Sequence, residues 1–593
     1  MKFQIYLKLI IDKIDKKEKL FFFLFSLLNI YHLYTLNFIP SLDGPQHLYI
    51  SNVIVNLLKS NDLINQYFAF NSVIVGNWTG HFILSFFNFL FPASIAEKLL
   101  LSTYYFGIVY SFRYLIISIK GKSSFLSFII FPFSTTTMVL LSYYNYSFGT
   151  IILFITLGYW VRIKMSKMNI KSFISLMSLF LLLYLSHVFV FMLCGLVLVV
   201  HYITFFVLNI VKSENRRSVL LHQLKKLTFL FLASLPSILL WINYTLIVTK
   251  LGGTIPKRYS FNELTDYLVI MRSLMAFHRG NEAPANISLF ILINLIIIYS
   301  IISRFIKFKR SGNNINSKVV FFRISDFWLL ISFVFLVLYY LFPDQLTSGN
   351  ITNRISIIMF FLLITWIGVQ EVPRWLSIVV AIMFISITIK QRVVQYEILS
   401  SLDNNVVELK ELDDYIDENS SFITLGTSGN WVHLHFHCYL GIDKSLVDLQ
   451  SPQCAGQFPV VWNSDKIPPT HIGLKNINEF KNNYLGLTST NYNEKIQIVD
   501  YILINKPGNF SKEETNKPII NVLQKYYTKL SVTSKKNYAL YKFKPRENIN
   551  RTINRIKNNE DWFNSVKEKA EIKGISVDNM LMLDALYLYD KYN

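Results

Sequence analysis

Long apolar runs dominate the first two thirds of the chain, and short polar segments separate them. Several runs exceed the roughly 18 residues that a helix needs to cross a hydrocarbon core about 30 Å thick. Only a helix satisfies its own backbone in lipid at this length, and the runs lack the alternation of a β-barrel strand. We predict an α-helical polytopic membrane bundle of about 11–13 spans, drawn from the apolar segments 20–39, 78–92, 95–119, 124–141, 148–161, 172–186, 188–209, 227–248, 286–304, 327–342, 354–371 and 375–390.

Basic residues between these segments predict which ends of the spans face the cytoplasm. Three clusters, at 162–171, 212–226 and 307–323, lie in short connections. Short cytoplasmic loops are enriched in Lys and Arg, so these connections are expected to be cytoplasmic. The intervening loops 249–285 and 343–353, and the C-terminal domain, are then expected outside.

The N-terminus is expected to be cytoplasmic as well. Six lysines precede Phe21, and no small-residue cleavage site follows the first apolar run, which we interpret as an uncleaved span. Twelve spans would return the chain to the cytoplasm, so one segment is misassigned. The short stretches within 78–161, interrupted by Pro92 and Pro132, are the place where we expect it. The predicted location is a cytoplasmic (inner) membrane, with the C-terminal domain extracytoplasmic.

Composition agrees with a membrane protein and argues against a nucleic-acid partner. Charged residues make up 16% of the chain, whereas soluble domains carry about 25%. The net charge of +21 is large, but much of the excess lies in the short loops where it sets topology. A smaller contribution from anionic lipid or polymer stays open, because some basic residues fall in the soluble part.

The first outer loop, expected at 40–77, contains a predicted helix. Pro45 suits a first helical turn. Apolar residues follow at i, i+3, i+4, i+7 and i+8, which form one stripe; they are Ile50, Val53, Ile54, Leu57 and Leu58. We expect this helix to lie flat on the membrane surface.

Composition changes near residue 392, where we expect the transmembrane domain (1–392) to end. Short strands are predicted at 422–426, 501–504 and 538–543, with polar helical segments between them, so 393–547 should form a small α/β soluble domain. Cys438 and Cys454 lie in this domain and could pair if it is exported.

The last segment, 548–593, is charged and helical in pattern. Gly574 can end one helix and Ser576 can cap the next. We interpret the segment as a helical hairpin appended to the α/β domain. A solvated tail is the alternative.

Asp43 is the first candidate for chemistry, at the start of the helix in the first outer loop. A carboxylate there could deprotonate an acceptor hydroxyl or bind a divalent cation. The alternative is structural, because an Asp just before Pro45 can simply cap the helix.

Several further residues could bind a phosphate at the outer face. Arg354 opens a span close to Asp344, where its guanidinium could hold a lipid-linked phosphate in two hydrogen bonds or could merely extend to the interface. His187 interrupts an apolar run and is either functional or hydrogen-bonded to a neighbouring helix. His278 and Arg279, with Arg258, offer further phosphate ligands from the loop 249–285.

Three histidines alternate along the soluble segment 431–438, at His433, His435 and His437. On a strand they would share one face, which is a suitable geometry for zinc. No carboxylate is spaced to complete such a site, and the segment could be helical, so packing and hydrogen bonding are the alternative.

Five segments resemble the GT-C superfamily of polytopic glycosyltransferases, in its bacterial branch of uncharacterised proteins. They are Asp43-Gly44-Pro45-x-His47-Leu48-Tyr49, Tyr144-Asn145-Tyr146-Ser147-Phe148-Gly149, Tyr184-Leu185-Ser186-His187-Val188-Phe189, Gly349-x-x-x-Asn353-Arg354 and Gly456-Gln457-Phe458-Pro459-Val460-Val461-Trp462. The resemblance implies a GT-C-like bundle whose first-loop acid is a catalytic base or metal-site residue. Asp43 takes that role here, and His47 of the same motif is the second catalytic candidate.

The resemblance also implies the reaction and its partners. A sugar would pass from a polyprenyl-phosphate-linked donor in the bilayer to a glycan, lipid or protein acceptor, with a divalent cation as the conceivable cofactor. Two alternatives stay open. A lipid-linked glycan transporter or flippase should show mid-membrane ionisable residues and an internal repeat. A catalytically silent scaffold is favoured by the lack of a second acid beside Asp43, since Asp62 lies at the far end of the predicted helix.

Overall fold

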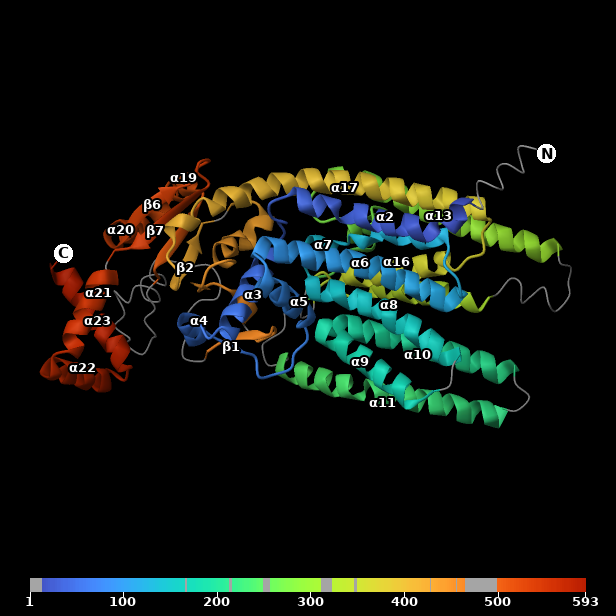
Figure 1. The fold of residues 1–593 in the computed structure, drawn as a ribbon, viewed down its shortest axis with the longest axis horizontal. Helices are drawn as coiled ribbons and strands as arrows, with labels where there is room; N and C mark the ends of the chain where they lie inside the picture. Colours follow the sequence, from blue (N-terminus) through green and yellow to red (C-terminus); the bar gives the residue numbers. More distant parts are fainter. Residues whose placement is uncertain are drawn as a thin grey trace. The chain divides into compact units, whose positions relative to one another are not determined.

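The computed structural model divides into two compact units. Unit 1 contains Met1–Ile39, Val73–Ile83 and Lys98–Ser401, and unit 2 contains Pro40–Ser72, Leu84–Glu97 and Leu402–Asn593. The structure describes residues 13–165, 168–212, 216–248, 256–310, 323–345, 349–426, 428–454, 456–463, 499–544 and 546–592. Figure 1 shows the elements of both units along the chain.

Unit 1 is helical. Eight described helices are long and apolar enough to cross a membrane, and three shorter apolar helices accompany them. Helices α8 to α11 lie side by side (Figure 1). The long helices are α6 (Ala93–Lys120), α8 (Tyr144–Met165), α10 (Val188–Lys212), α11 (Arg216–Val248), α13 (Arg279–Arg310), α15 (Phe327–Leu341), α16 (Ile351–Gly368) and α17 (Arg374–Lys410); the shorter ones are α5 (Thr79–Leu90), η2 (Phe125–Ser134) and α9 (Ile170–Ser186). The predicted multi-pass helical bundle is confirmed.

Burial separates the central helix of this bundle from its rim. In α16, 94% of the most apolar 18-residue stretch is buried inside the protein, whereas in α11 only 17% of the corresponding stretch is buried. Exposed side chains of α11, such as Leu239 and Leu246, form the surface that lipid would cover. A helix that is apolar and buried on all sides lies at the core of a bundle, so α16 is positioned by its neighbours.

Two predicted spans are not ordinary transmembrane helices. Segment 124–141 folds as the 3-10 helix η2 followed by the short α7 (Thr137–Leu140), because Pro132 and a run of hydroxyl residues prevent a continuous α-helix. Segment 20–39 gives the 13-residue helix α2 (Glu18–Ile30) and then the 3-10 turn η1 (Tyr31–Thr35). Segment 124–141 lies within 78–161, the stretch in which the predicted topology required one misassigned span.

A five-stranded mixed sheet forms the centre of unit 2, in the order β3-β2-β5-β7-β6. Strand β2 runs parallel to β3 and β5, while β7 is antiparallel to β5 and β6. The strands are β2 (Ser420–Leu425), β3 (Leu446–Asp448), β5 (Tyr501–Asn505), β6 (Tyr527–Val532) and β7 (Tyr538–Phe543), with α19 (Pro507–Phe510) and α20 (Lys517–Tyr526) between β5 and β6. The three predicted strands and the α/β class are confirmed.

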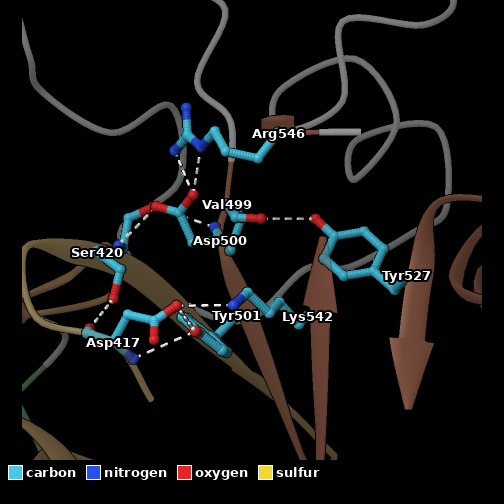
Figure 2. Close-up of polar contacts among 9 residues, drawn as sticks. Asp417, Ser420, Val499, Asp500, Tyr501, Tyr527, Lys542 and Arg546 are labelled. Atoms are coloured by element: carbon cyan, nitrogen blue, oxygen red, sulfur yellow. Dashed lines mark hydrogen bonds and ion pairs between the residues drawn. The ribbon is translucent and has the colours of Figure 1, made fainter. Parts of the chain in front are cut away.

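Two carboxylates tie the strand ends of this sheet together (Figure 2). Asp417 accepts hydrogen bonds from the Tyr501 hydroxyl and the Lys542 ammonium, each at 2.7 Å. Asp500 accepts from the Arg546 guanidinium at the start of α21 (Arg546–Lys557). Both acids are therefore structural, although each is close to a cation that could suggest a binding site.

The first-loop helix is a core element of unit 2. Helix α3 (Gly44–Leu58) occurs where it was predicted, but Tyr49, Ile50 and Val53 are buried in one cluster with strands β2, β3 and β5. The expectation of a helix lying flat on a membrane surface is therefore wrong. Its apolar stripe was detected correctly, but the stripe meets protein rather than lipid, because the C-terminal sheet offers an apolar face to cover.

Segments flanking α3 extend this association. Helix α4 (Asp62–Tyr67) and the strand β1 (Phe68–Phe70) follow, and β1 pairs antiparallel with β4 (Val460–Trp462). The unit boundary also differs from the expected one at 392, which falls inside α17. Local sequence patterns did not predict the core that α3 shares with the sheet, because Tyr49 of α3 and Leu446 of β3 lie 397 residues apart in the chain.

The C-terminal segment folds as three helices rather than a two-helix hairpin. They are α21, α22 (Glu560–Lys573) and α23 (Val577–Tyr592), seen together in Figure 1. Gly574 ends α22 in the left-handed conformation, as predicted, and Ser576 accepts a hydrogen bond from the Asn579 amide. Val566, Ala570 and Met580 form a small buried core, so this segment is not a solvated tail.

Candidate functional sites

Asp43 occupies the N-cap position of α3, but its carboxylate accepts no capping hydrogen bond from that helix. The hydroxyl oxygen of Ser41 instead accepts from the Gly44 amide, at 3.1 Å. The side chain of Asp43 is 24% exposed. The structural alternative, in which the Asp43 carboxylate caps α3, therefore loses its main support, and the carboxylate is directed to other contacts.

One of these contacts is His435, whose Nε2 lies 3.8 Å from Asp43 Oδ1. Burial lowers the pKa of His435 to about 4, with His437 beside it acting in the same direction and Asp448 opposing. His435 is therefore a neutral imidazole near pH 7, and the contact is not an ion pair there. A neutral imidazole beside a carboxylate can carry or accept a proton.

His47, the second catalytic candidate, is buried and lies one turn after Asp43 on α3. Its backbone amide donates to the Asp43 carbonyl at 3.0 Å, and its ring meets Phe458 edge-to-face at 6.5 Å. Phe458 belongs to the Gly456–Trp462 motif. Two of the segments quoted for the family resemblance are thus in contact within unit 2.

The histidine segment is a 3-10 helix, η7 (Trp431–Gly441), so the helical alternative holds and the strand on which a shared zinc-binding face depended does not form. Asn430 caps it, because its side-chain oxygen accepts from the Val432 amide and its carbonyl accepts from the His433 amide at 3.0 Å. His433 stacks on Phe436 with ring centres 4.3 Å apart, while the rings of His435 and His437 lie 6.3 Å apart. The single face that the alternation predicted for all three histidines does not form.

Two groups near His437 were missed as ligands from the sequence. Asp448, at the end of β3, is fully buried, and its Oδ2 lies 3.2 Å from His437 Nε2. Cys438 is also buried and its thiol lies 3.5 Å from the same oxygen. Cys438 and Cys454, which could have paired, form no disulfide, since all three cysteines of the chain are free. An acid inside the apolar run Leu446–Leu449 was the available signal for Asp448.

Tyr49 links α3 to this carboxylate. Its hydroxyl donates to the Leu446 carbonyl at 3.1 Å and accepts from the Asp448 amide at 2.9 Å. The hydroxyl is fully buried and burial raises its pKa well above 10, so it stays protonated and can donate. The last residue of the Asp43–Tyr49 motif therefore fixes the strand that carries Asp448.

Unit 1 holds a second cluster, around Arg354 on the buried helix α16. The Tyr146 hydroxyl donates to the Arg354 carbonyl at 2.8 Å. The guanidinium carbon lies 5.7 Å from the ring centres of both Tyr143 and Tyr146, and His187 meets Tyr146 edge-to-face at 5.4 Å. Three segments of the family resemblance come together here, from α8, the α9–α10 junction and α16.

The other predicted phosphate ligands have different surroundings. Asp344 is buried and its Oδ1 accepts from the Thr352 amide at 3.1 Å, so it caps the first turn of α16. Arg279 pairs with Asp266 at 2.7 Å on the surface, and His278 and Arg258 are exposed. Arg272, in η4 (Arg272–Leu274), packs against α16 instead, with its guanidinium 4.1 Å from the Tyr267 ring centre.

Comparison with solved structures gives a likeness in fold, whereas the comparisons of sequence give none. No protein-family model matches the chain, and no curated protein sequence matches it. The crystal structure of ArnT from Cupriavidus metallidurans bound to undecaprenyl phosphate superposes with a TM-score of 0.46 at 9% sequence identity, covering 88% of this chain and 97% of that chain. A likeness at this score assigns neither a family nor an activity to the chain.

Proposed function

We propose that this multi-pass membrane protein is a GT-C-type glycosyltransferase. It moves a sugar from a polyprenyl-phosphate-linked donor to an acceptor at the outer face of the cytoplasmic membrane. The observation that carries the proposal is Asp43, an acid at a helix start that does not cap the helix and contacts a neutral histidine. The resemblance of its motif to the first loop of GT-C enzymes gives the reaction class.

Asp43 acts as the base toward the acceptor. Its carboxylate removes the proton of the acceptor hydroxyl while that oxygen bonds to the anomeric carbon of the sugar, and the bond to the carrier phosphate breaks. A general base of this kind contributes about 10²- to 10⁴-fold to a rate. The neighbouring imidazole of His435, 3.8 Å away, is neutral near pH 7 and lines the site beside the carboxylate. A divalent cation held at Asp43 would serve the same acceptor by polarising its hydroxyl.

Arg354 binds the carrier phosphate. A guanidinium is always charged and presents two parallel N–H donors to a phosphate. Its placement on α16 between two tyrosine rings holds the side chain in a low-dielectric setting, where a charge-assisted hydrogen bond is strong. The leaving phosphate gains negative charge as the glycosidic bond breaks, so this cation favours departure as well as binding.

The test compares lipid-linked sugars and surface glycans in cells lacking the gene and in cells complemented with variants. Wild type should restore the glycan and deplete the donor. Asp43→Asn should leave the donor unused while the protein still inserts in the membrane. The matched control is Asp62→Asn, an exposed acid on the neighbouring helix α4, which should complement fully.

Three results would reject the proposal. Full complementation by Asp43→Asn would show that the Asp43 carboxylate is not the catalytic base. Glycan that is assembled normally but retained on the inner leaflet in the deletion strain would identify a flippase instead. An unchanged glycan and lipid profile in the deletion strain would favour the silent scaffold.

A further inference from the structure

Three metal-ligating side chains converge in unit 2, beyond what the proposed transfer reaction uses. They are His437 and Cys438 of η7 and Asp448 of β3. Their ligand atoms all lie within 4.8 Å of one another. We propose that His437 Nε2, Cys438 Sγ and Asp448 Oδ2 bind one zinc ion, which joins the 3-10 helix to the sheet.

The distances suit a tetrahedral ion. Asp448 Oδ2 lies 3.2 Å from His437 Nε2 and 3.5 Å from Cys438 Sγ. Zinc binds nitrogen and oxygen at about 2.0–2.2 Å and sulfur at about 2.3 Å, which places neighbouring ligand atoms roughly 3.3–3.7 Å apart. The two edges to Asp448 are close to that interval, and the third, between His437 Nε2 and Cys438 Sγ, is at most 4.8 Å, so an ion would draw these side chains together. Imidazole, thiolate and carboxylate together are a donor set that favours zinc over magnesium or calcium.

Charge gives an independent reason for a cation. Asp448 and Cys438 are both fully buried. A buried carboxylate without a matching positive charge strongly destabilises the fold. Zinc bound by one thiolate, one carboxylate and one neutral imidazole is electrically neutral, and the thiol loses its proton to solvent on binding. A zinc ion bound here would therefore balance the negative charge of the buried Asp448 carboxylate, and no protonated histidine would be required.

The surroundings of Asp448 orient it for this role. Its Oδ1 accepts from the Gln450 amide at 3.0 Å, and its own amide donates to the Tyr49 hydroxyl. One carboxylate oxygen is thus fixed by the backbone, and the other is directed at His437 and Cys438. Outer contacts of this kind are what metal ligands normally have. Three protein ligands leave a fourth position for water.

The experiment measures metal on the purified full-length protein in detergent. Wild type should hold about one zinc per chain after incubation with zinc and removal of excess. Replacement by Co²⁺ should give the near-ultraviolet thiolate-to-cobalt charge-transfer band. His437→Gln and Cys438→Ser should each weaken zinc binding by at least about 100-fold, since even an outer-contact change costs 10- to 100-fold. Cys454→Ser and His433→Gln are the matched controls and should bind as wild type.

Absence of the thiolate–cobalt band from wild type would overturn the proposal without any variant. Zinc content unchanged in Cys438→Ser, with the fold verified by its thermal transition, would also overturn it. Asp43→Asn should retain the zinc. Loss of transfer with zinc intact would therefore concern the proposed reaction alone, and loss of zinc with transfer intact would concern this site alone.

Discussion

The two clusters differ in the kind of charge they hold. Around Arg354, in the membrane unit, a permanent cation lies between aromatic rings on a helix buried on all sides. Around Asp43 and Asp448, in the second unit, the charged groups are carboxylates next to histidines and a thiol. The first arrangement suits an anion and cannot be switched by pH. The second suits protons and cations.

This division matches the two demands of the proposed reaction. The donor brings a phosphate, which a fixed cation binds at any physiological pH. The acceptor brings a proton to be removed, which requires a group that titrates. Variants that remove the cation of the Arg354 cluster should therefore weaken donor binding. Variants that remove the carboxylate of the Asp43 cluster should instead impair proton removal from the acceptor.

Arg354 should show the largest effect on activity. Arg354→Gln removes the cation and should lower transfer about 100-fold or more, the value of one or two charge-assisted hydrogen bonds. Arg354→Lys keeps the charge but loses the paired N–H geometry, so it should retain an intermediate activity. The measurement is glycan transfer by membranes with equal protein content. Arg279→Gln, which breaks only an exposed ion pair, should leave transfer within about twofold of wild type. An equal loss of transfer in Arg354→Gln and Arg279→Gln would show that Arg354 has no specific role in binding the phosphate.

Tyr49→Phe should give the largest effect on stability without changing charge. It leaves the Leu446 carbonyl and the Asp448 amide without their buried partner. Each unsatisfied group costs about 1–3 kcal/mol, so the free energy of unfolding of unit 2 should fall by roughly 2–6 kcal/mol. The thermal transition of the purified protein measures this. Tyr587→Phe on α23, where the side chain is exposed, is the control and should change nothing measurable.

His433 should make the stability of the second unit depend on pH. Burial, with Lys506 nearby, lowers the pKa of His433 from 6.5 to about 4. The unfolded chain takes up the proton first as pH falls, so stability should decrease between pH 6.5 and about 4 and be constant above that interval. The contribution is roughly 1–2 kcal/mol after allowing for solvent screening of a partly exposed ring. Thermal unfolding against pH should show a flatter profile for His433→Gln. If His433→Gln had the same pH profile of thermal unfolding as wild type, a group other than His433 would be responsible for the pH dependence.

Tyr146→Phe should have the smallest effect. It removes one hydrogen bond to the Arg354 carbonyl while keeping the ring beside the guanidinium. Loss of about 1 kcal/mol in holding this part of α16 should weaken donor binding by about fivefold. Titration of the purified protein with a polyprenyl phosphate measures it. A loss as large as that of Arg354→Gln would mean that the hydroxyl itself contacts the donor.

Local patterns predicted the elements well where the signal came from neighbours in the chain. The apolar periods located most of the long helices, and short runs of β-branched or aromatic residues located β2, β5 and β7. The position of Pro45 in the first turn of α3 and the end of α22 at Gly574 followed from backbone preferences. Segment 124–141 failed because hydrophobicity alone cannot distinguish an α-helix from a 3-10 helix containing Pro132.

Contacts between distant segments were beyond those patterns. The stripe of α3 indicated a buried face without indicating which surface covers it, and the sheet of unit 2 proved to be that surface. Alternating histidines suggested a strand, but the cap at Asn430 begins a 3-10 helix that separates His433 from His437. Asp448 could have been noted as an acid in an apolar run, yet its proximity to Cys438 depends on a parallel strand pairing that no local signal encodes.

Donor binding by three purified proteins tests the division of roles most directly. Wild type, Asp43→Asn and Arg354→Gln would each be titrated with a polyprenyl phosphate in lipid nanodiscs. Arg354→Gln should bind about 10- to 100-fold more weakly, whereas Asp43→Asn should bind within about twofold of wild type. Binding that Arg354→Gln leaves unchanged, or that Asp43→Asn weakens as strongly, would contradict the assignment of anion and proton to separate clusters.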